Sequence, residues 1–78
     1  MIYNYDNTIE LSKEEQQYYN INSLIKIFWS SDNKYYKGKV KSVFKKYTNE
    51  KNIIILHLIE YESGEILHNL SELKYKVI

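Results

Sequence analysis

From Leu24 onward, short apolar segments alternate with short polar turns, and this pattern constrains the fold more than any other feature. The segments LIKIFW, YYKGKVKSVFKKY, NIIILHLIEY, EILHNL and KYKVI are rich in β-branched and aromatic residues, as strands are. Residues 30–33, 48–52 and 62–65 have the composition of turns, and residues 71–73 that of a short helical turn. Because the turns leave no room for crossover helices, five neighbouring strands predict an all-β protein, a small antiparallel barrel.

The second segment predicts a strand with one buried and one solvent-facing side. Tyr36, Gly38 and Val40 share one parity, and lysines fill the other. Val43 interrupts this alternation, which predicts a bulge or bend near it. The third segment is apolar at nearly every position and is expected to be buried on both faces. The expected core is Leu24, Ile27, Val40, Phe44, Ile54, Leu56, Ile66, Leu70, Leu73 and Val77.

Residues 1–20 are polar and show no strand pattern, so we expect an N-terminal extension in front of a barrel of residues 21–78. Ser12, followed three residues later by Glu15, is typical of a capping box and predicts a short helix over about residues 12–19. A helix this brief is marginal alone, so we expect it to pack on the barrel.

Composition argues against several function classes. The 78 residues include no cysteine, and neither His57 nor His68 has acidic neighbours at ligand spacing, so we expect no metal and no cofactor. Gly38 and Gly64 form no phosphate loop and no serine lies in a nucleophile motif, so we expect no enzyme activity. No apolar run approaches the ~20 residues of a membrane helix, so no membrane association is expected.

Three aromatic residues stand at expected strand ends. Trp29 ends the first strand, Tyr36 starts the second across the same turn, and Tyr61 ends the third beside Glu60 and Glu62. Aromatic faces next to carboxylates form a cage for a methylated ammonium or guanidinium, because the ring quadrupoles attract the cation. The alternative is that Trp29 and Tyr61 only cap one end of the barrel.

The order of these motifs resembles that of Tudor domains over about residues 19–76. The matching stretches are WSSDNKYYKGKV, then IILHLIEYESGEILHNLSEL after a polar turn. The first stretch is similar to the methyllysine-reading Tudor domain of the checkpoint mediator, and NLSEL to the methylarginine-reading survival motor neuron and splicing-factor domains. The resemblance implies an SH3-like five-stranded antiparallel barrel, with a short N-terminal helix in this chain.

By the same resemblance, Trp29, Tyr36 and Tyr61 are cage walls, and Leu58 or Ile59 stands where the family usually has another aromatic. Two further positions bear on the ligand. Glu62 and Ser63 replace the Gly-Asn pair of the arginine readers, and Glu60 or Glu62 would supply negative charge. The implied function is binding of methyllysine on a histone tail or of methylarginine on an arginine-rich protein, in the nucleus.

Two other functions stay open. Residues 34–46 carry six lysines and no acid, and Lys37, Lys39 and Lys41 would share a strand face on which Tyr35 and Tyr47 stack on the bases of a nucleic acid. The lack of arginine weighs against this alternative. The other is a degenerate Tudor scaffold without a methyl ligand, which Leu58 in place of an aromatic would explain.

Overall fold

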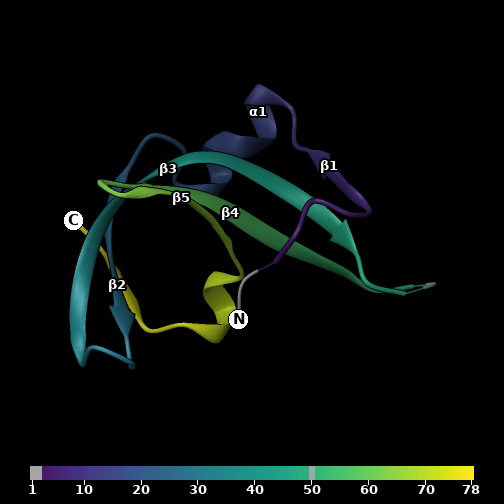
Figure 1. Ribbon diagram of the computed structural model, residues 1–78. Coiled ribbons are helices and arrows are strands. Elements are labelled where there is room, and N and C mark those ends of the chain that lie inside the picture. The colour runs from purple at the N-terminus through teal and green to yellow at the C-terminus, as the bar shows by residue number, and fades with distance from the viewer. Residues whose placement is uncertain (1–2, 50) are drawn as a thin grey trace.

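The computed structural model describes residues 3–49 and 51–78, and it is an antiparallel β-protein with one short α-helix (Figure 1). The elements in chain order are β1 (Thr8–Glu10), α1 (Lys13–Gln16), the 3-10 helix η1 (Gln17–Tyr19), β2 (Leu24–Trp29), β3 (Lys34–Tyr47), β4 (Ile53–Tyr61), β5 (Gly64–His68), the 3-10 helix η2 (Leu70–Glu72) and β6 (Tyr75–Val77). The five strands expected after Leu24 are therefore present, as is the helical turn before the last one. Within the described residues, none of the helices has the length and apolar character needed to cross a membrane.

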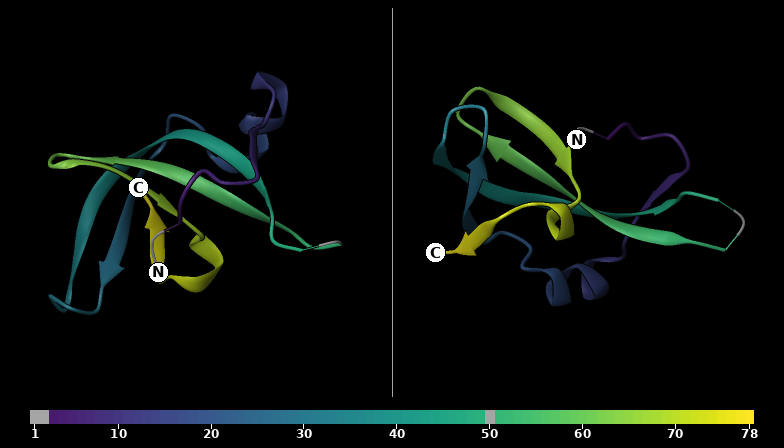
Figure 2. Two further views of the ribbon diagram at one scale, coloured as in Figure 1. Left: turned by 45° about the vertical axis from the view of Figure 1, so that its right-hand side comes forward. Right: turned by 90° about the horizontal axis from the view of Figure 1, so that it is seen from below.

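The strands pair in the order β5-β4-β3-β2-β6. On the same edge of β3, β2 pairs with residues 34–39 and β1 with residues 44–46. The sheet curls strongly, and the β3–β4 hairpin extends past the rest of the molecule (Figures 1 and 2). In the described part of the chain, β5 and β6 do not pair with each other, so the sheet is not a closed barrel. Instead, Tyr3 donates its backbone N–H to the carbonyl of Leu67 in β5 (3.2 Å).

A β-bulge bends β3 where its pairing with β4 shifts between Val40 and Ser42. A regular strand turns residues three apart to opposite faces, but the extra residue, Lys41, lets Val40 and Val43 enter the same core cluster. The bulge predicted near Val43 is confirmed. It also sends Phe44 to the other face of the sheet.

Two apolar clusters lie on opposite faces of β4, so this strand is buried on both sides as predicted. The first cluster contains Leu11, Ile25, Ile27, Val40, Val43, Ile59 and Leu70, and the second contains Leu56, Leu58 and Leu67. The expected core was wrong at Leu24 and Val77, which are 45% and 50% exposed. Ile25 takes their place, because the buried face of β2 is that of Ile25 and Ile27.

The predicted N-cap at Ser12 is confirmed at the start of α1, where the Ser12 hydroxyl accepts a hydrogen bond from the Glu15 N–H (3.2 Å). The Glu15 carboxylate accepts from the Ser12 hydroxyl (3.2 Å) rather than from the Ser12 backbone N–H, as it would in a full capping box. The helix packs on the sheet through the buried Gln16 amide, which donates to the Leu11 carbonyl (2.7 Å) and accepts from the Val43 N–H (3.0 Å). The expectation of no strand before residue 20 was wrong, because β1 pairs with β3. The N-terminal segment is thus hydrogen-bonded into the sheet.

Candidate functional site: an aromatic pocket between β2, β3 and β4

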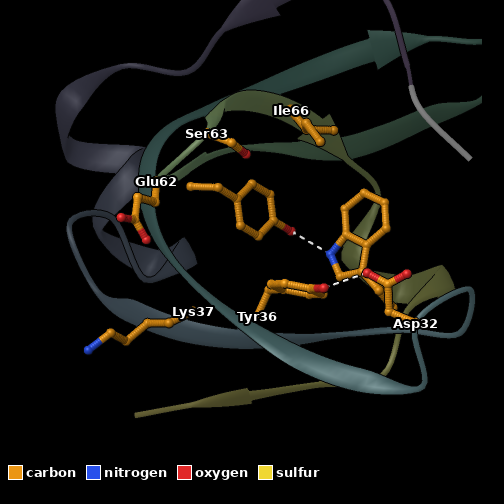
Figure 3. Close-up of a pocket in the computed structure, with 8 residues that line it drawn as sticks. Asp32, Tyr36, Lys37, Glu62, Ser63 and Ile66 are labelled. Carbon is orange, nitrogen blue, oxygen red and sulfur yellow. Dashed lines mark hydrogen bonds between the residues drawn. The ribbon is translucent and has the colours of Figure 1, made fainter.

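A pocket of about 550 Å³ opens where β2 ends, β3 begins and β4 ends (Figure 3). It is lined by Trp29, Asp32, Tyr36, Lys37, Tyr61, Glu62, Ser63 and Ile66. The three aromatic residues expected to come together from separate strands therefore do so. Alternation along the strands explains this, since each of the three side chains points to the concave side of the sheet.

Trp29 makes edge-to-face contacts with the other two rings. Its centroid lies 6.4 Å from that of Tyr36 with planes at 88°, and 6.0 Å from that of Tyr61 with planes at 73°. Edge-to-face pairs at such distances are favourable, and all three aromatic residues line one pocket. A cation within about 6 Å of a ring centroid is attracted by the ring quadrupole. The arrangement can therefore hold a small organic cation.

A chain of hydrogen bonds behind the pocket fixes two of its walls. The indole Nε1–H of Trp29 donates to the Tyr61 hydroxyl (3.3 Å), which is hydrogen-bonded to Nε2 of His68 (2.9 Å). The His68 ring also packs on Trp29, with centroids 5.6 Å apart. Burial lowers the pKa of His68 to about 4 and raises that of Tyr61, so both groups are neutral at neutral pH.

The third wall is held from the β2–β3 turn. The Tyr36 hydroxyl donates to a carboxylate oxygen of Asp32 (Figure 3), and this hydrogen bond raises the pKa of Tyr36. The ammonium of Lys34 lies 5.1 Å from the Tyr36 ring centroid. The ring thus already makes one cation–π contact within the chain, and the Asp32 carboxylate adds negative charge to the pocket rim.

Gly38 gives Tyr61 room to lie against β3. A Cβ at this position would stand 2.5 Å from Cγ2 of Ile59 and 3.4 Å from Cδ1 of Tyr61. Ile59 is fully buried and branched at Cβ, so it has little freedom to move aside. The glycine between Tyr36 and Val40 therefore serves the close approach of β4 side chains to β3.

The glutamates of the β4–β5 turn have different surroundings. Glu62 lines the pocket together with Ser63. Glu60 does not line this pocket. Its carboxylate oxygen lies 3.6 Å from the ammonium nitrogen of Lys41, which also pairs with Glu65. Negative charge at this pocket therefore comes from Glu62 and Asp32.

Neither position considered for a fourth aromatic wall lines the pocket. Leu58 is 8% exposed and belongs to the second cluster, on the opposite face of β4. Ile59 is buried in the first cluster beneath Gly38. The remaining apolar wall is Ile66 of β5, the cross-strand partner of Ile59.

The three lysines expected on one face of β3 divide between two environments. Lys37 and Lys39 lie before the bulge, on the face away from the core (Figure 3 shows Lys37 extending away from the ring of Tyr36). Lys41 lies in the bulge and pairs with Glu60 and Glu65. Lys41 is therefore already neutralised within the chain.

Sequence reasoning missed Asp32, Ile66 and His68 as parts of this site. Asp32 carried a signal, because a turn acid four residues before Tyr36 can reach its hydroxyl. Ile66 follows from the pairing of β5 with β4, once the register is known. His68 gave no local signal, since its role depends on Tyr61 across the same hairpin.

In residues 3–49 and 51–78, no group of three or more His, Asp or Glu side chains is arranged to hold a metal ion. No family model matches the chain, and no match was found among curated proteins or among solved structures.

Proposed function

We propose that this chain is a Tudor-type SH3-like domain that binds a methylated lysine side chain of a protein tail in the aromatic pocket. The observation that carries the proposal is the meeting of Trp29, Tyr36 and Tyr61 around one cavity, with Asp32 and Glu62 at its rim. Methylation lowers the hydration of an ammonium, so an aromatic enclosure favours the methylated form.

The strand order supports the fold part of this proposal. A meander of β2, β3, β4 and β5, followed by a 3-10 turn and a last strand paired back to β2, is the connectivity of small SH3-like barrels. The strongly bent β3 fits a sheet that curls toward closure.

The acids favour an ammonium with remaining N–H groups. A mono- or dimethylated lysine keeps an N–H that can donate a hydrogen bond to a carboxylate. Glu62 lines the pocket and forms no ion pair among the described residues, so its carboxylate is free to accept this bond. The Tudor resemblance implies a histone tail for methyllysine and an arginine-rich protein for methylarginine; we favour the histone tail, and the nuclear location depends on the same proposal. Affinity should be in the micromolar to millimolar range, because the pocket is open and a short tail buries little area.

Titration with matched peptides tests the proposal. Trp29 is the only tryptophan of the chain, so its fluorescence reports directly on the pocket. Peptides carrying unmodified, dimethylated and trimethylated lysine should differ, with saturable fluorescence changes only for the methylated forms. Preferential binding of a dimethylarginine peptide would instead assign the pocket to methylarginine.

Two adjacent tyrosines give a matched pair of variants. Tyr36→Leu removes a wall of the pocket and should abolish binding of the methylated peptide. Tyr35→Leu alters a neighbouring, partly buried ring on the opposite face and should leave that binding unchanged. If neither variant affects peptide binding, or if no methylated peptide binds at all, the pocket is not a methyl-ligand site.

A further inference from the structure

The convex face of β2, β3 and β6 points away from the core and collects lysines. Lys37 lies at the edge of this face and also lines the pocket. Lys26 is directly opposite Lys37 of β3 on one side and Lys76 of β6 on the other. We call this surface the lysine face, formed by Lys26, Lys37, Lys39, Lys74 and Lys76 with the rings of Phe28 and Tyr35.

The row through Lys26 carries an electrostatic cost within the protein. Like charges directly opposite one another on neighbouring strands are destabilising. Strands β2, β3 and β6 contain no acidic residue, although Lys39, at the edge of the face, is directly opposite Glu60 of β4. Among the described residues Lys41 is the only lysine in a salt bridge, so Lys26, Lys37 and Lys76 form none. An anionic ligand would neutralise this row.

Two aromatic rings lie within the same surface. The Phe28 and Tyr35 centroids are 5.3 Å apart, at an interplanar angle of 66°. The ammonium of Lys74 lies 5.5 Å from the Phe28 ring and that of Lys76 lies 5.2 Å from the Tyr35 ring. The lysine head groups thus rest on ring faces, from which they can turn to a phosphate while a base takes their place.

We propose that the lysine face binds single-stranded nucleic acid. Lysines spread over adjacent strands would follow the phosphates, and Phe28 and Tyr35 would stack on unpaired bases, the two contacts that sequence-tolerant single-strand binders combine. An acidic peptide would satisfy the charges but would not use both rings. The surface keeps Lys37, Lys39 and Tyr35 from the sequence-based alternative, adds residues of β2 and β6, and excludes Lys41.

Fluorescence anisotropy with labelled oligothymidine and oligouridine of about 12 nucleotides tests this inference. Lys26→Gln combined with Lys76→Gln should weaken binding at least tenfold and reduce the slope of log affinity against log salt by about 1.4, since each phosphate contact contributes about 0.7. The matched control is Lys13→Gln with Lys51→Gln, which removes the same charge from exposed positions elsewhere and should change affinity less than about twofold.

The variants Tyr35→Leu and Tyr36→Leu supply the second half of the test. For oligonucleotide binding, Tyr36→Leu is the control, whereas for peptide binding the control was Tyr35→Leu. Tyr35→Leu should weaken oligonucleotide binding on the order of tenfold by removing a stacking platform, whereas Tyr36→Leu should not change it. The double variant Lys26→Gln with Lys76→Gln should have an unchanged or higher thermal midpoint of unfolding, because it removes the repulsion between these two lysines.

Three outcomes would overturn the inference. One is the absence of oligonucleotide binding at about 50 mM salt, where phosphate contacts are strongest. Another is an equal loss in the Lys13 and Lys51 control, which would indicate non-specific attraction. The third is equal competition by polyglutamate together with no effect of Tyr35→Leu, which would assign the face to an acidic peptide.

Discussion

Acidification should destabilise the fold through His68. This histidine is 3% exposed, and its burial lowers its pKa to about 4 from the ordinary value of 6.5. Between these two pH values the unfolded chain binds a proton at this imidazole and the folded protein does not. The free energy of unfolding is therefore unaffected by His68 above pH 6.5 and falls as the pH drops toward 4.

The expected loss is large for a small domain. At about 1.4 kcal/mol per pKa unit, the difference between 6.5 and about 4 corresponds to about 3 kcal/mol. Small proteins have total stabilities of about 5–15 kcal/mol, so this one group removes a substantial share. Most of the loss should be complete by about pH 4.5.

Urea unfolding followed by Trp29 fluorescence at about pH 7.5 and 4.5 measures this loss. With a slope of about 1–2 kcal/mol per molar urea, the midpoint of the wild type should fall by roughly 1.5–3 M. His68→Phe keeps a ring against Trp29 but cannot titrate, so its midpoint should fall less with pH, although its stability at neutral pH is lower. Burial also lowers the pKa of His57, the other buried histidine. His57→Phe therefore measures how much of the acid-induced loss of stability comes from His57.

Protonation of carboxylates destabilises wild type and variants alike, so the difference between them isolates His68. If His68→Phe loses as much stability on acidification as the wild type does, the reasoning from burial is wrong.

Three further substitutions test packing that the site depends on. Leu58→Phe should destabilise the fold by about 1–3 kcal/mol in thermal unfolding without tightening peptide binding, because Leu58 packs in the second cluster; tighter binding would contradict this placement. Gln16→Ala should cost about 1–3 kcal/mol in urea unfolding, since it leaves the buried N–H of Val43 without its partner, and a neutral effect would show that water replaces the amide. Gly38→Ala should cost about 1–3 kcal/mol and weaken methyl-peptide binding, because the added methyl group displaces Ile59; a variant of wild-type stability and affinity would refute the close approach.

Local pattern predicted most of the elements but not how their faces are assigned. The strand segments, the N-cap at Ser12 and the bulge near Val43 followed from composition and periodicity over a few residues. Strand β1 did not, because Thr8–Glu10 is a three-residue strand with a single apolar residue, Ile9, which is itself exposed. A strand stabilised mainly by backbone pairing leaves little hydrophobic signal.

The candidate site shows the same limit. Strand ends were enough to bring Trp29, Tyr36 and Tyr61 together. Leu58 was misjudged as a candidate wall because a strand buried on both faces gives no sign of which cluster each residue joins. Similarly, the place of His68 behind the pocket depends on the register of β4 and β5, which only the assembled sheet defines.

The bulge at Lys41 makes positions along β3 unequal in their tolerance of inserted residues. Before the bulge, one added residue would exchange the faces of Tyr35 and Tyr36, turning the pocket wall outward and a residue of the lysine face inward. The turns at residues 30–33 and 48–52 can change length without altering that assignment. Related chains should therefore vary in length at these turns and keep a fixed count from Tyr35 to Val43, which gives an anchor for aligning sequences too diverged to match residue by residue.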